Sequence, residues 1–138
     1  MGIIAALFIH SAVFSVCEKT LLLKIKMIGD GEMDAELYIK KASLQMAKGE
    51  IEKAVDSMKK AIEVGGDIVA AVQARCFLGE YYFVHQNYML SKENLEWISE
   101  RAEELETDYD DLLNDEMAKA DMLLEMMETF ALSEEYNG

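Results

Sequence analysis

Apolar residues recur at helical spacing along most of the chain. Between residues 34 and 105 they fall three or four positions apart, which places them on one face of an α-helix. Short polar or glycine-containing stretches interrupt this pattern at 48–50, 65–67 and 85–87. Glycine tolerates the left-handed backbone that ends many helices, and Asp67 can cap the helix that follows. We therefore expect two antiparallel helical hairpins in tandem.

Each end of the chain predicts one more helix. Residues 1–29 form the most apolar segment, and their few polar residues gather mainly on one narrow stripe. Residues 110–132 carry a second apolar stripe with spacings of three and four, made up of Leu113, Met117, Ala120, Leu124, Met127 and Ala131. Met122 and Met126 lie off that stripe and are expected to be exposed. Because the chain also has no proline, the expected fold class is all-α.

The apolar segment at residues 1–29 has more than one interpretation. Its apolar run from Ile3 to Cys17 spans 15 positions, fewer than the roughly 20 that a membrane-spanning helix needs. No lysine or arginine precedes the run and no small-residue cleavage site follows it, which disfavours a secretory signal. We therefore expect a helix that either caps the helical stack or exchanges with its twin in a homodimer. A signal or membrane anchor is the remaining alternative.

The two hairpins repeat each other. Ala42 and Gly79 occupy corresponding positions in their first helices, 37 residues apart, and Ala54 and Ser91 do so in their second helices. Such small residues let paired helices approach closely. A helix-turn-helix pattern with a period in this range is typical of stacked helical repeats. Two repeats alone leave apolar faces uncovered, so the terminal helices are expected to act as caps.

Residues 35–105 resemble the tetratricopeptide repeat (TPR) family. The first hairpin matches the family pattern at Tyr38, Ala42, Gly49, Ala54 and Ala61, and the second matches it at Leu78, Gly79, Tyr82, Asn87 and Tyr88. The chain departs from the pattern at Lys41, Gln45, Gly65, Gly66 and Ser91. The resemblance implies tandem antiparallel hairpins wound into a right-handed superhelix. Residues 1–138 would then form a single domain of two repeats between capping helices.

The resemblance also implies a binding groove. In the family, the first helix of each repeat lines a concave surface that holds an extended peptide or a partner helix. The corresponding residues of this chain are Glu36, Ile39, Ser43 and Met46 in the first repeat, and Gln73, Cys76, Glu80 and Phe83 in the second. The carboxylate clamp of the best-known subgroup is not expected, because Ile39, Ser43 and Phe77 stand at its positions. This mixture of apolar and polar residues suits a segment with hydrophobic anchors.

Charge narrows the choice of partner. The chain has 27 acidic and 13 basic residues, which gives a formal net charge of −14, and residues 96–138 carry 15 of the acids and 2 of the bases. Because this field repels phosphate backbones and anionic lipids, we expect no nucleic-acid partner and no electrostatic docking on membranes. Residues 103–111 lack the glycine of a calcium-binding loop. They are expected to form a solvated helix end and loop, with a surface for a basic partner as the functional alternative.

No motif in the sequence indicates catalytic chemistry. The chain has no HExxH motif, no glycine-rich phosphate loop and no CxxC pair, so we expect no catalytic residue, metal site or cofactor. His85 is expected to be solvated at a turn, His10 to be packed in the N-terminal helix, and Cys76 to be a buried, inert thiol. With only Cys17 besides, the cysteine content suits a reducing, cytoplasmic location. The expected function is a non-enzymatic adaptor or chaperone-like module; the alternative is a self-associating structural module.

Overall fold

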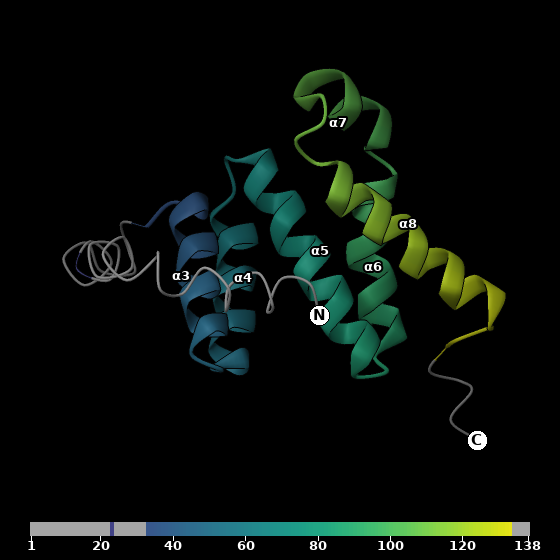
Figure 1. Ribbon diagram of the computed structural model, residues 1–138, viewed down its shortest axis with the longest axis horizontal. Helices are drawn as coiled ribbons and strands as arrows, with labels where there is room; N and C mark the ends of the chain where they lie inside the picture. Colours follow the sequence, from purple (N-terminus) through teal and green to yellow (C-terminus); the bar gives the residue numbers. More distant parts are fainter. Residues whose placement is uncertain (1–22, 24–32, 134–138) are drawn as a thin grey trace. The chain divides into compact units, whose positions relative to one another are not determined.

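The computed structural model describes residue 23 and residues 33–133. Between residues 33 and 133 the chain forms six helices (Figure 1), namely α3 (Ala35–Ala47), α4 (Ile51–Val64), α5 (Ile68–Val84), α6 (Tyr88–Ser99), α7 (Ala102–Tyr109) and α8 (Asn114–Thr129). This range contains no strand, so the all-α prediction is confirmed for it. The helix predicted at residues 1–29, with His10 and Cys17, lies outside the described residues.

The helices group into two compact units. The first unit contains α3 and α4 and ends at Ala70. The second unit begins at Ala71 and contains the rest of α5 together with α6, α7 and α8. The first predicted hairpin therefore lies in the first unit, and the second hairpin lies in the second unit except for the first three residues of α5.

The α3–α4 hairpin has a capped first helix and the close helix contact that its small residues predict. Asp34 caps α3, because its side-chain oxygen accepts a hydrogen bond from the Leu37 amide at 2.8 Å. Ala42 and Ala54 are fully buried, as expected for small residues between paired helices. Ser57 Oγ donates a hydrogen bond of 2.6 Å to Gln45 Oε1 and so ties the two helices together.

The α5–α6 hairpin depends on a glycine at the helix contact. A Cβ atom added at Gly79 would lie 2.4 Å from Leu95 Cδ2, and Leu95 is fully buried. Ser91 Oγ donates a hydrogen bond of 2.7 Å to the Gly79 carbonyl. Ser91 can reach this carbonyl because Gly79 has no side chain to separate the helices. The predicted close approach at Gly79 and Ser91 is confirmed. Asn87 caps α6 by accepting a hydrogen bond from the Leu90 amide.

The acidic segment differs from its predicted structure. The apolar pattern predicts a fourth helix that continues through Ala102, with a solvated helix end and loop at residues 103–111. Instead, α6 ends at Ser99 and residues 102–109 form the separate helix α7. In a continuing helix the Trp97 carbonyl would accept from the Arg101 amide. Here that carbonyl accepts a 2.9 Å hydrogen bond from Arg101 Nη1, and the Arg101 amide bonds instead to the Ile98 carbonyl. Burial of Leu105 anchors the new helix, and the predicted helix end and loop are found at Tyr109 and at the turn of residues 110–113.

The C-terminal helix packs against α6 within the second unit (Figure 1). It is shorter than the predicted range 110–132, and its buried positions are Leu113, Met117, Ala120, Leu123 and Met127. Leu123 is therefore more deeply buried than the predicted Leu124. The two positions lie on either side of the apolar stripe, and the contact of α8 with its neighbour determines which of them is buried. Ala131 is exposed beyond the helix end, contrary to prediction. Met122 and Met126 are exposed, as predicted.

Candidate functional site

The predicted groove positions of the first repeat lie along α3. Glu36 is exposed and pairs with Lys40 at 2.7 Å, whereas Ile39 and Ser43 are half-buried and Met46 is buried. Ser43 Oγ donates a hydrogen bond to the Ile39 carbonyl one turn earlier, which occupies its hydroxyl within the helix. Ile39 is thus the partly accessible apolar residue among these four.

The predicted groove positions of the second repeat lie along α5, where α8 contacts two of them. Cys76 is buried with its Sγ 3.9 Å from the Glu116 carbonyl oxygen of α8. Glu80 Oε2 lies 3.1 Å from Lys119 Nζ of α8. Gln73 and Phe83 are half-buried. Because α8 contacts Cys76 and Glu80, the predicted groove on α5 depends on Gln73 and Phe83.

Burial controls the chemistry of Cys76, whose thiol is free. Desolvation raises the pKa of this thiol to about 12, and Glu116 and Glu80 act in the same direction while Lys119 opposes them. The thiol therefore stays protonated at neutral pH. Because the thiolate is the nucleophile, the structure agrees with the expected inert thiol.

We expect iodoacetamide to modify Cys76 only when the second unit opens. In a Cys17→Ser variant at weakly alkaline pH, alkylation should be slow in buffer and should accelerate in denaturant, as followed by intact mass. The raised folded-state pKa adds stability that is complete below the ordinary thiol pKa and is lost as the pH rises toward about 12. Alkylation of the folded protein as fast as of a short cysteine peptide would contradict this prediction.

The histidine expected to be solvated lies where the sequence places it. His85 is exposed at the turn after α5, its Nδ1 lies 2.8 Å from the Tyr81 carbonyl oxygen, and its ring stacks on Tyr81. Within residues 33–133 no three His, Cys, Asp or Glu side chains are grouped so that they could hold a metal ion. In the same range, no helix combines the length and apolar character that crossing a membrane requires.

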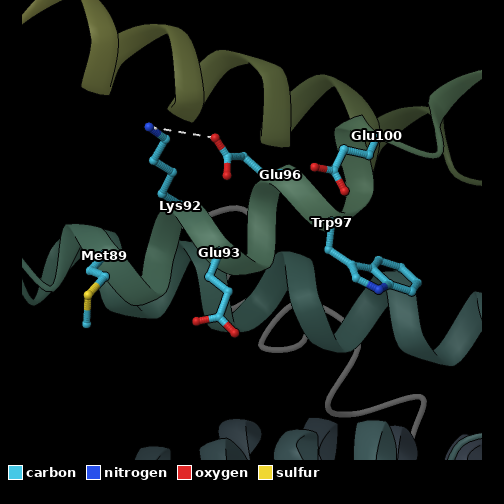
Figure 2. Close-up of a pocket in the computed structure, with 6 residues that line it drawn as sticks. All are labelled: Met89, Lys92, Glu93, Glu96, Trp97 and Glu100. Carbon is cyan, nitrogen blue, oxygen red and sulfur yellow. Dashed lines mark ion pairs between the residues drawn. The ribbon is translucent and has the colours of Figure 1, made fainter.

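The outer face of α6 carries a surface site that the sequence reasoning did not identify. Two rows of side chains project from it at i, i+4 spacing, and the six residues line a depression of about 460 Å³. Figure 2 shows the first row, Met89, Glu93 and Trp97, and the second row, Lys92, Glu96 and Glu100, on different sides of the helix. We call this surface the α6 outer face. It is opposite to the buried stripe that holds α6 in the second unit.

Trp97 is held in place by two arginines. The guanidinium carbon of Arg101 lies 4.0 Å from the centre of the tryptophan ring, and that of Arg75 lies 4.7 Å from it. Arg101 also bonds to the Trp97 carbonyl, and Arg75 Nη1 donates to Asn94 Oδ1 of α6 at 3.3 Å. The indole is therefore a braced aromatic surface rather than a freely rotating side chain.

The charges on this face are partly balanced. Lys92 pairs with Glu96 at 3.7 Å, and Arg101 approaches Glu100 at 4.0 Å. Burial lowers the pKa of Arg75, Glu93 opposes that shift, and Arg101 adds to it. Glu93 thus provides negative charge near the Arg75 guanidinium. Carboxylates beside a fixed indole and an exposed thioether can hold a cationic chain together with an apolar anchor.

The sequence contained a signal for this face. Trp97 is the only tryptophan of the chain, and spacing places Glu93 and Glu100 one turn before and one turn after it, on the half of the helix that faces away from the apolar stripe. The apolar spacing of this helix correctly places its stripe in the core and assigns no role to the opposite face. Only the arginine contacts around Trp97 distinguish it from an ordinary exposed face.

Comparison of the chain with models of known protein families, with curated protein sequences and with solved structures gives no significant match.

Proposed function

We propose that the chain is a small, TPR-like, non-enzymatic module that binds a segment of another protein. Two hairpins with corresponding close contacts support the repeat interpretation: Ala42 and Ala54 are fully buried in one, and Gly79 meets Ser91 and Leu95 in the other. In this proposal the hairpins continue one another in a right-handed superhelix. The free thiol of Cys76 supports a reducing, cytoplasmic location.

The α6 outer face is the observation that carries the proposal. Met89 is 63% exposed at one end of it, and the braced indole of Trp97 stands at the other. Exposed large apolar side chains beside a polar rim mark protein interaction sites, and tryptophan is among the residues that dominate binding energy there. A fixed aromatic ring loses little conformational entropy when a partner covers it.

Capture of a partner followed by rebinding of the purified partner tests the function. We expect Met89→Glu to weaken that purified interaction by about tenfold or more, because a carboxylate would be buried where a thioether packed. Isothermal titration calorimetry measures the affinity. Far-UV circular dichroism should be unchanged, since Met89 is exposed and contributes little to the fold.

Val64→Glu is the matched control. Val64 is 50% exposed at the end of α4 in the first unit, so the same change of charge falls on a different surface. We expect it to leave the affinity unchanged. If no captured protein rebinds after purification, or if Val64→Glu weakens binding as much as Met89→Glu does, the proposal at this face is wrong. Ile39→Glu and Phe83→Glu then test the predicted groove against the same partner.

A further inference from the structure

We infer that the α6 outer face receives a basic amphipathic helix of the partner protein, with cationic side chains on the glutamates and apolar side chains on Met89 and Trp97. This inference rests on the proposed function and specifies the partner at the same face. Two observations carry it, the charge of the face and the arrangement of its two rows.

Charge complementarity favours a cationic partner. Three of the six residues that line the face are glutamates and one is a lysine. The side chains of Glu96 and Glu100 are 49% and 73% exposed, so water rather than protein surrounds much of each carboxylate. Beyond the face, α7 adds Glu103 and Glu104 in its first turn. The resulting field attracts a basic segment and repels an acidic one.

The two arginines do not reverse this preference. Arg75 and Arg101 lie over the Trp97 ring, and each has a carboxylate nearby, Glu93 in one case and Glu100 in the other. These ion pairs cancel part of the charge of Glu93 and Glu100, so the net negative charge comes mainly from the surrounding sequence, since residues 96–138 carry 15 acids and 2 bases. Arg101 also donates a hydrogen bond to the Trp97 carbonyl. What remains for a partner at this end is the uncovered part of the indole that lines the depression.

The arrangement of the rows favours a helix over an extended strand. Side chains at 89, 93 and 97 form one i±4 ridge, and those at 92, 96 and 100 form the next (Figure 2). The groove between two such ridges accepts the ridge of another helix. Met89 and Trp97 are eight residues apart, about 12 Å along the axis, so apolar side chains two turns apart on the partner would meet both.

Trp97 makes the test direct, because it is the only tryptophan and lines the site. Three helix-forming peptides of equal length, all lacking tryptophan and tyrosine, share the same leucine positions and carry lysine, glutamine or glutamate elsewhere. Each is titrated into the full-length protein while Trp97 emission is recorded. We expect a saturable change with the lysine peptide, tightest at low salt, and at least about tenfold weaker binding of the other two.

Two triple variants of equal net charge separate site binding from general attraction. In the first, Glu93, Glu96 and Glu100 become glutamine; in the second, the exposed Glu63, Glu125 and Glu128 do. We expect the first to weaken binding of the lysine peptide by about tenfold and the second by much less, because exposed charge pairs act over short distances in salt. Equal weakening in both would overturn the inference.

The remaining outcomes distinguish the inference from the proposed function. If the glutamine peptide binds as tightly as the lysine peptide, the face binds helices without charge selection, and only the partner class is wrong. If no peptide changes Trp97 emission, the inferred docking is wrong. Binding of the captured partner to the Ile39→Glu and Phe83→Glu variants of this chain still tests the proposed function. If emission instead changes with protein concentration and light scattering gives a dimer, the occupant is a second copy and the inference is overturned.

Discussion

Leu113→Ala is expected to destabilise the second unit by about 2–5 kcal/mol. Leu113 is fully buried at the start of α8, so alanine would leave a cavity in addition to the lost transfer of apolar surface. The effect should extend to Cys76, since α8 covers that thiol. Urea unfolding is followed by Trp97 fluorescence, which reports directly on this unit because the only tryptophan lies on α6.

Leu112→Ala is a control one residue away. Leu112 is 63% exposed, so its truncation removes the same atoms from a surface position and should change stability by no more than about 0.5 kcal/mol. Equal destabilisation by the two substitutions would show that the start of α8 is not packed as described. Leu113→Ala should also accelerate Cys76 alkylation in buffer, whereas Leu112→Ala should not.

Gly79→Val is expected to destabilise the α5–α6 hairpin by about 2–4 kcal/mol, from overpacking and the loss of one hydrogen bond. The new Cβ alone would lie 2.4 Å from Leu95 Cδ2, and Leu95 is fully buried and has little room to move. Separation of the helices would also break the hydrogen bond from Ser91 to the Gly79 carbonyl. The gain in helix propensity on replacing glycine is smaller than these losses. Urea unfolding monitored by Trp97 measures the difference.

A double variant shows whether the clash with Leu95 is the cause. Leu95→Ala alone should cost about 2–5 kcal/mol through its cavity. In Gly79→Val/Leu95→Ala the valine fills part of that cavity, so the combined loss should be smaller than the sum of the single losses by about 1 kcal/mol or more. Additive losses would mean that Gly79→Val acts elsewhere, for example through the backbone of α5.

These stability variants also help to interpret the binding experiments. Leu113, Gly79 and Leu95 hold the second unit together from its buried side, whereas Met89 and the glutamates of the α6 outer face are exposed. If a substitution of Met89 or of these glutamates weakens binding and leaves urea unfolding unchanged, the surface itself contributes to binding. A loss that tracks the unfolding free energy reports on the scaffold.

Much of the fold is readable from local patterns. Spacings of three and four predict α3 to α6 and the core of α8, and the predicted cap Asp67 and the turn at Gly65 agree with the observed ends. The small residues Gly79 and Ser91 identify the close contact of α5 and α6. These features are readable because each depends on residues within one or two turns, where spacing determines which side chains share a face.

The tertiary structure decided what spacing leaves open. Whether Leu123 or Leu124 is buried depends on which neighbour α8 meets, and the separate helix α7 depends on the burial of Leu105 and the capture of the Trp97 carbonyl by Arg101. The α6 outer face becomes a candidate site only when Arg75 of α5 reaches the Trp97 ring. Sequence by itself determined the helical class and its pairing, because hydrophobic periodicity acts locally. Contacts between residues far apart in the chain depend on how the helices pack, and that packing is set by the whole unit.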